Sequence, residues 1–144
     1  MKVYLCGPID IEMLDHCLQW RKFACLELAN MDCVGIDPCR NGNHPAPDDN
    51  GDLNSIPVGS KTLVQRDMRD VRQSDLVLCY WPDRATKRGI GTLMELSLAM
   101  LWHKPVLLVD PGEMVSHHPW IQEAVTEYHS GLKDALDAIG NYWR

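Results

Sequence analysis

The stretch from residue 74 to residue 102 is SDLVLCYWPDRATKRGIGTLMELSLAMLW. Residues 76–80 form a short, continuously apolar run, as expected for a strand that is covered on both faces. Gly89 and Gly91 follow, and residues 92–102 then have the length and composition of a helix. A buried strand that leads through a glycine-containing turn into a helix is typical of α/β proteins.

The same alternation of strand and helix continues through the rest of the chain. Apolar runs predict further strands at residues 3–6, 33–36 and 105–109, and a short fifth strand at 125–129. Apolar residues at helical spacing lie between them, and Ser60 and Ser130 are the expected N-caps of two of the helices. We therefore expect an α/β fold: a flavodoxin-like, doubly wound sandwich with a five-stranded, mainly parallel sheet.

The composition narrows the classes of ligand and partner. Of 144 residues, 45% are hydrophobic and 24% charged, so we expect one domain over residues 1–144. No apolar run approaches the ~20 residues of a membrane helix, and the first residues resemble a strand and not a signal peptide, so we expect a cytoplasmic protein without membrane contact. A net charge of −6 and a single basic doublet, Lys87-Arg88, argue against a nucleic-acid polymer, whereas a mononucleotide needs only a few donors.

Six cysteines are spread along the chain without a CxxC pair. Because most of them lie in apolar stretches, we interpret them as buried thiols and not as disulfides. The alternative is a zinc site that combines them with His117 and His118, but the spacings fit no standard zinc pattern. We therefore expect neither a metal nor a cofactor.

Prolines follow four of the predicted strands closely and end them sharply, at Pro8, Pro38, Pro82 and Pro111. Ligands of parallel α/β sheets bind beyond the carboxyl ends of the strands, so we expect the functional site near these prolines. Residues 38–59 are rich in Pro, Gly, Asn and Asp. This composition and length predict a lid over the site, with an unstructured surface segment as the alternative.

Glu95 is the leading catalytic candidate among the residues of the glycine-containing turn. Gly89 and Gly91 let the backbone approach a ligand, and a helix N-terminus offers free N–H groups to a phosphate or to sugar hydroxyls. Thr92-x-x-Glu95 also fits a capping box, in which Glu95 would bond only to the N-cap. The helix is otherwise almost wholly apolar, so we expect it to be buried on every side, in part by a second subunit. A carboxylate there would need partners or a function.

Asp67 is a second candidate carboxylate. It lies in a charged stretch of the second predicted helix, one residue before Met68 of that helix's apolar stripe. The pattern alone is equally compatible with a site residue and with a solvated one. We interpret Arg69 and Asp70 of the same stretch as a solvated face with Arg/Asp pairs.

Tyr4 is either a core aromatic or a partner of a carboxylate. It lies inside the first predicted strand, three residues before Gly7. A buried tyrosine hydroxyl needs a hydrogen-bond partner, and a carboxylate is a natural one. We interpret Trp20-Arg21, on the first predicted helix, as packing and surface charge.

Seven segments occur in order and at suitable spacing from Met1 to about Val109: Tyr4-Leu5-Cys6-Gly7-Pro8-Ile9, Trp20-Arg21, Asp37-Pro38, Arg66-Asp67-Met68, Ser74-Asp75-Leu76-Val77-Leu78, Gly91-Thr92-x-x-Glu95-Leu96 and Lys104-Pro105-Val106. Together they resemble the nucleoside 2-deoxyribosyltransferase superfamily, which includes deoxynucleoside 5′-monophosphate N-glycosidases.

The resemblance implies a flavodoxin-like fold and a homo-oligomer with shared active sites. It also implies transfer of 2-deoxyribose from a small nucleoside or nucleotide to a free nucleobase, through a covalent deoxyribosyl-enzyme. Glu95 then matches the nucleophile, Asp67 the carboxylate that interacts with the base, and Tyr4 the tyrosine that orients the nucleophile. The substrate-binding residues that we expect are Gly7, Pro8, Ile9, Asp37, Arg40, Asp83, Gly89, Gly91 and Thr92.

The chain departs from the family just before Gly91-Thr92. Family members often carry an acidic residue or a serine there, whereas this chain has Lys87-Arg88-Gly89-Ile90, and Asp83 could substitute from the loop. Basic residues at this point could favour a 5′-phosphate. A 2′-deoxynucleoside 5′-monophosphate N-hydrolase, with water as acceptor, is therefore the alternative function. A phosphoribohydrolase that releases cytokinin bases and a non-enzymatic nucleotide sensor are further alternatives, and the segment from Ser116 onward matches the family poorly.

Overall fold

The apolar runs form one central sheet. A computed structural model describes residues 1–9, 13–42, 60–82 and 89–144 of the chain. The strands are β1 (Lys2–Cys6), β2 (Val34–Ile36), β3 (Leu76–Tyr80), β4 (Val106–Val109) and β5 (Glu127–His129). They pair in the order β2-β1-β3-β4-β5, and every pairing is parallel. The predicted flavodoxin-like α/β fold with a five-stranded sheet is confirmed.

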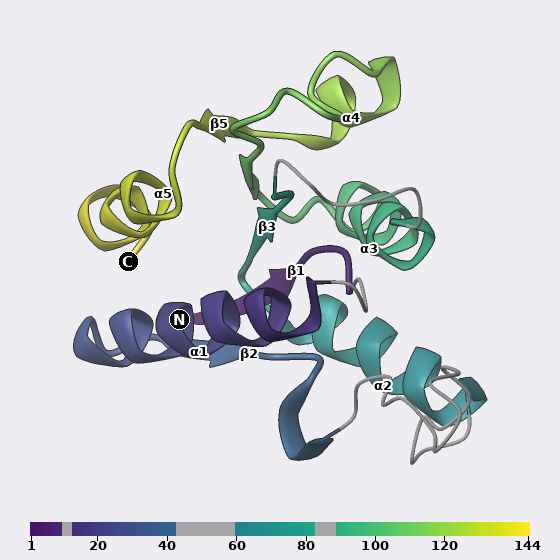
Figure 1. Ribbon diagram of the computed structural model, residues 1–144, viewed down its shortest axis with the longest axis horizontal. Helices are drawn as coiled ribbons and strands as arrows, with labels where there is room; N and C mark the ends of the chain where they lie inside the picture. Colours follow the sequence, from purple (N-terminus) through teal and green to yellow (C-terminus); the bar gives the residue numbers. More distant parts are fainter. Residues whose placement is uncertain (10–12, 43–59, 83–88) are drawn as a thin grey trace.

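Helices connect the strands and cover both faces of the sheet. They are α1 (Leu14–Asn30), α2 (Ser60–Gln73), α3 (Ile90–Leu101), α4 (Pro119–Ala124) and α5 (Leu132–Ala138), with short turns η2 (Arg40–Gly42) and η3 (Ile139–Trp143). Residues of α1 and α5 pack on one face, and residues of α2, α3 and α4 pack on the other (Figure 1). Because all connections join parallel strands, the carboxyl ends of the strands meet at one edge.

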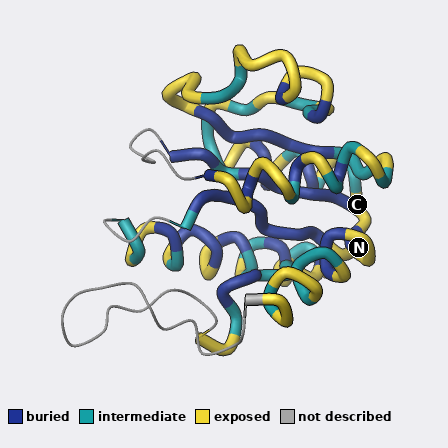
Figure 2. Tube along the Cα trace, turned by 90° about the vertical axis from the view of Figure 1, so that its right-hand side faces the viewer, coloured by how far each residue is buried: buried dark blue, intermediate teal, exposed yellow. Residues whose placement is uncertain are grey.

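Alternation along β1 sends its side chains to the two faces in turn. Val3 and Leu5 belong to the core under α1 and α5, whereas Tyr4 and Cys6 belong to the core under α2 and α3. The three inner strands are almost wholly buried, and the helices expose their outer sides (Figure 2). Tyr4 and Cys6 therefore face α3, the helix that carries Glu95.

Several local predictions were wrong. Helix α3 begins at Ile90 with Gly89 as its N-cap, so Thr92 lies inside the first turn. The N-cap of α5 is Gly131 and not Ser130, whose hydroxyl instead donates to Asp134 Oδ2 at 3.4 Å.

The short helix α4 has no counterpart among the predicted elements. Pro119 occupies its first turn, and the His118 ring accepts a hydrogen bond from the Trp120 N–H at 3.3 Å. This cap, and not an apolar stripe, defines the start of the helix.

We expected α3 to be buried on every side, in part by a second subunit, and this stays a prediction because the structure holds a single chain. Three apolar side chains on its outer side are exposed, Ile90 by 71%, Met94 by 62% and Leu101 by 66%. Among the described residues, no helix combines the length and the apolar character needed to cross a membrane. Most of the expected lid, residues 43–59, lies outside the described part of the chain.

Candidate functional site

Glu95 is held by two side chains of β1. The Tyr4 hydroxyl donates a hydrogen bond to Glu95 Oε1 at 2.7 Å, and the Cys6 thiol donates to Oε2 at 3.1 Å. Tyr4 and Cys6 are fully buried, whereas the Glu95 side chain is half-buried. Because the carboxylate is bonded to the sheet and the helix cap is Gly89, Glu95 is not part of a capping box.

The electrostatics of this group keep both donors protonated. Burial, together with the negative charges of Glu95 and Asp67, raises the pKa of Tyr4 well above its usual value. Burial and the neighbouring groups likewise raise the pKa of the Cys6 thiol. Burial also raises the pKa of Glu95, and the hydrogen bonds from Tyr4 and Cys6 partly oppose that rise. At neutral pH the carboxylate therefore has two neutral donors beside it.

Asp67 lies within electrostatic range of this group, and its charge raises the pKa of both Tyr4 and Glu95. Arg66 donates two hydrogen bonds to Asp67 Oδ1, from Nε at 3.0 Å and from Nη2 at 2.8 Å. Burial raises the pKa of Asp67, and the bonds from Arg66 oppose that rise. Two carboxylates and a tyrosine from three different elements thus influence one another's ionisation.

Asp70 was interpreted as a solvated residue, and this was wrong. Its side chain is buried and pairs with Nη2 of Arg40. Nη1 of the same arginine donates to the Asp37 carbonyl at 2.9 Å. Arg69, by contrast, is exposed as expected, and the expected Arg/Asp pair is present, because its Nε lies 3.9 Å from Asp70 Oδ1. The end of β2 is thereby tied to α2 beside Asp67.

Arg21 was interpreted as surface charge, and this was also wrong. Its side chain is fully buried and donates to the carbonyls of Gly7 and Cys17, each at 2.7 Å. Its Nε lies 3.8 Å from Asp37 Oδ1, and its guanidinium stacks over Trp20 at 4.5 Å. Arg21 thus joins the turn after β1 to the turn after β2.

The glycines that sequence reasoning assigned to substrate binding have different surroundings. A Cβ at Gly7 would lie 2.6 Å from the Tyr80 carbonyl, and one at Gly89 would lie 2.0 Å from the Trp81 ring, so close packing explains both. A Cβ at Gly91 would meet no described atom within 4 Å. Among these glycines, Gly91 is the one that leaves open space at the start of α3.

Other expected substrate-binding residues lie around the same edge of the sheet. Pro8 accepts a bond from the Cys17 thiol at 3.4 Å, and Ile9 is half-buried. Thr92 is buried in the first turn of α3. Asp83 lies outside the described residues, as do Lys87 and Arg88.

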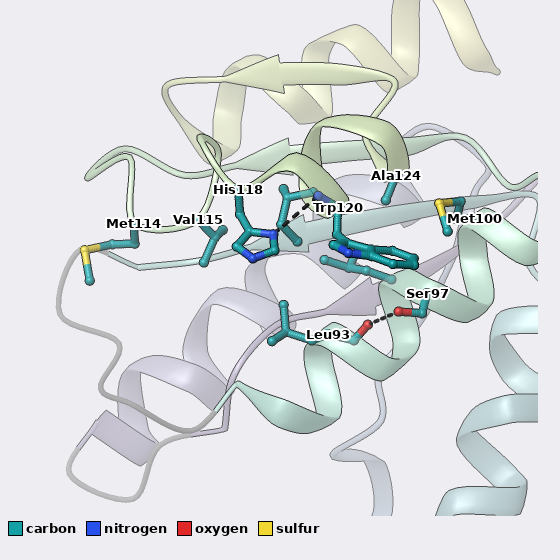
Figure 3. A pocket seen from close by; sticks show the side chains of 10 residues that line it. Leu93, Ser97, Met100, Met114, Val115, His118, Trp120 and Ala124 are labelled. Carbon is teal, nitrogen blue, oxygen red and sulfur yellow. Dashed lines mark hydrogen bonds between the residues drawn. The ribbon is translucent and has the colours of Figure 1, made fainter.

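An apolar pocket of about 310 Å³ lies on the other side of α3, between it and α4 (Figure 3). Leu93, Ser97 and Met100 of α3 line it together with His118 and Trp120. Glu95 is not among its lining residues. All six cysteines are free thiols, and no metal-binding cluster of His, Cys, Asp or Glu occurs in the described part of the chain.

Comparisons with solved structures support the fold. No family model matches the sequence, and no curated protein matches it. Among solved structures, a 2-deoxyribosyltransferase from Bacillus psychrosaccharolyticus has a TM-score of 0.67 at 20% identity, over 99% of this chain and 92% of that one. This chain has the fold of a 2-deoxyribosyltransferase.

Two further structures share that fold. A CMP N-glycosidase from Clostridium botulinum has a TM-score of 0.62 at 14% identity, over 99% of this chain and 100% of that one. A conserved protein from Enterococcus faecalis has a TM-score of 0.65 at 17% identity, over 96% of both chains. Enzymes that act on N-glycosidic bonds are therefore among the structures to which this chain is similar.

Cys6 is the contact of Glu95 that sequence reasoning missed. The signal was present, because residues i and i+2 of a strand point to the same face and Cys6 follows Tyr4 at this spacing. Once Tyr4 is assigned as the partner of a carboxylate, the same carboxylate is within reach of Cys6.

Proposed function

We propose that this chain is a nucleoside 2-deoxyribosyltransferase that uses Glu95 as its nucleophile. The observation that carries the proposal is the Glu95 carboxylate, bonded at one oxygen to Tyr4 and at the other to Cys6, with Asp67 in electrostatic range. A half-buried carboxylate with an elevated pKa and neutral donors at a sheet edge is a typical functional group.

The reaction runs in two displacements. A Glu95 oxygen attacks C1′ of the 2′-deoxynucleoside, the C1′–N bond breaks, and its electron pair leaves with the base. The negative charge beside C1′ stabilises the oxocarbenium-like transition state. A second nucleobase then attacks C1′, releases Glu95 and restores the original configuration. In this scheme Asp67 contacts the base, donates a proton to the departing base and takes one back from the incoming base.

The substrate would bind across the carboxyl edge of the sheet. The turn Gly7-Pro8-Ile9 borders it on one side, and the first turn of α3 at Gly91 and Thr92 borders it on the other. Open space at Gly91 and the free N–H groups of that turn support contact with sugar hydroxyls or with a phosphate. Asp37 and Arg40 would contribute from the end of β2.

The second candidate function is hydrolysis of a 2′-deoxynucleoside 5′-monophosphate, with water in place of the second base. The similarity to a CMP N-glycosidase over the whole length of both chains supports this alternative. The two functions share Glu95 and the first displacement, and they differ in the acceptor.

A base-exchange assay tests the proposal. The enzyme is incubated with a deoxynucleoside, or with its 5′-monophosphate, in the presence and absence of a second free base. We expect a new deoxynucleoside, whereas release of free sugar alone would support the hydrolase. Glu95→Gln should lower turnover by at least about a thousandfold, because the covalent step is lost.

Glu113→Gln is the matched control for this experiment, because Glu113 is exposed and pairs only with His117 among the described contacts. It should keep turnover near that of the unchanged enzyme. Full activity of a folded Glu95→Gln protein would overturn the proposed mechanism.

We also propose that the apolar outer side of α3 packs against a second copy of the chain, next to the shared active sites. Ile90, Met94 and Leu101 expose large apolar surfaces there, and Trp120 adds another on α4. Light scattering should return a multiple of the mass of one chain, and Met94→Lys should shift that mass toward a single chain. A single-chain mass for the unchanged protein would contradict this proposal.

A further inference from the structure

Tyr4 and Cys6 each donate a hydrogen bond to a different oxygen of the Glu95 carboxylate. They are neighbours on the same face of β1, and the hydroxyl donates at 2.7 Å and the thiol at 3.1 Å. Two other described partners lie near the thiol: the Thr92 carbonyl, which is farther away at 3.8 Å, and the thiol of Cys79, which is a weaker acceptor than a carboxylate. The shorter, charged acceptor is the stronger one, so the thiol proton points to Glu95.

We infer that Cys6 is a positioning residue, whose thiol fixes the rotation of the Glu95 carboxylate and favours its ionised form. The inference rests on the proposed role of Glu95 as the nucleophile. It assigns to Cys6 a task in the reaction that Tyr4 alone does not complete.

The physical reason lies in the last torsion of glutamate. Rotation of a carboxylate about its terminal bond is broad, so one hydrogen bond leaves the second oxygen free to swing. A donor on each oxygen holds the plane of the group, and with it the lone pair that would reach C1′. A thiol is a weak donor, so it orients the carboxylate without withdrawing as much charge as a hydroxyl.

Two features indicate that Cys6 acts on Glu95 and not directly on a substrate. Its side chain is fully buried, so its replacement changes little of the surface that a substrate would touch. Burial, the neighbouring Cys79 and the charge of Glu95 raise the pKa of its thiol, so the group stays a donor at neutral pH. A change at Cys6 should therefore affect kcat and the pH profile more than KM.

Cys6→Ala and Cys6→Ser test this inference as a pair. Cys6→Ala should lower kcat about three- to tenfold with little change in KM, because one hydrogen bond to the carboxylate is lost. In the profile of kcat/KM against pH, the acid limb of Cys6→Ala should move up by roughly half a pH unit, because the ionised form of Glu95 loses a donor. Cys6→Ser keeps a donor, so its kcat should stay within about threefold and its acid limb should stay at or below the original pH.

Cys33→Ala is the matched control. Cys33 is another buried thiol, but it lies in the core on the opposite face of the sheet and donates to the Met31 carbonyl at 3.5 Å. It loses the same atoms, and its acid limb should not move. If Cys6→Ala and Cys6→Ser lose equal activity with an unmoved acid limb, Cys6 only fills space and the inference is wrong.

A stability measurement separates this inference from the proposed function. The difference in free energy of unfolding between each protein and its Glu95→Gln variant is followed across pH, since its pH dependence reports the pKa of Glu95. We expect that pKa to be highest with Cys6→Ala and no higher with Cys6→Ser than with the unchanged chain. If this order appears without turnover of any nucleoside, the proposed function fails and the effect of Cys6 on Glu95 stands. If turnover needs Glu95 but the order is absent, the inference fails alone.

Discussion

Two carboxylates next to the sheet, Asp110 and Glu95, have different kinds of hydrogen-bond partners. Asp110 follows β4 and accepts three backbone N–H bonds at 2.9 Å, one from Met114 to Oδ1 and two from Val115 and Ser116 to Oδ2. Glu95 faces β1 and accepts one hydroxyl and one thiol. Asp110 is buried, and Glu95 is half-buried.

The comparison shows that two carboxylates near the same sheet can differ in what their hydrogen-bond donors do, and that burial alone does not reveal this difference. The donors of Asp110 belong to the backbone of one turn, so its lone pairs are used to hold that turn together. The donors of Glu95 are two side chains that orient the group and leave lone pairs on both oxygens. The first arrangement serves the fold, and the second is suited to attack on an electrophile.

Asp110→Ala should produce the largest effect on stability. It leaves three backbone N–H groups without their acceptor, so we expect the free energy of unfolding to fall by about 3 kcal/mol. Urea denaturation at neutral pH measures this change, and Glu95→Gln, measured beside it, should lose much less. The acid limb of Asp110→Ala should stay in place. A loss below about 1 kcal/mol would mean that the turn does not depend on Asp110.

The sequence predicted the sheet well because each inner strand can be recognised from its own residues. The runs at β3 and β4 are apolar at every position, and buried parallel strands need this pattern whatever surrounds them. Helix α4 was missed because it has six residues and is defined by Pro119 and the His118 cap. A helix without a long apolar stripe shows no hydrophobic periodicity in its sequence, so it cannot be predicted from that pattern.

The site was predictable only in part, because its contacts join distant segments. Tyr4 and Glu95 are 91 residues apart in the chain, and their pairing followed from a resemblance and not from local pattern. Arg21 and Asp70 appeared to be surface charges, because nothing nearby in sequence reveals their buried partners. The backbone acceptors of Arg21 become visible only when the turns after β1 and β2 are brought together.

Tyr4→Phe should produce a smaller effect, and one of a different kind from Asp110→Ala. It keeps the ring in the core and removes the shorter of the two bonds to Glu95. That bond lowers the pKa of Glu95, so its loss should raise this pKa further. In the proposed mechanism the attacking carboxylate must be ionised. Activity should therefore fall at a higher pH as the solution is acidified, and the acid limb of kcat/KM should move upward.

The sizes of the effects of Tyr4→Phe and Asp110→Ala also distinguish Glu95 from Asp110. At neutral pH we expect Tyr4→Phe to lower kcat about tenfold and the free energy of unfolding by about 1 kcal/mol, since one hydrogen bond is lost. Tyr142→Phe is the matched control, because Tyr142 is 81% exposed. If Tyr4→Phe destabilises the protein as much as Asp110→Ala and leaves the acid limb unmoved, Glu95 is a structural carboxylate like Asp110. A moved limb with a small loss of stability would instead mark Glu95 as the group on which the chemistry depends.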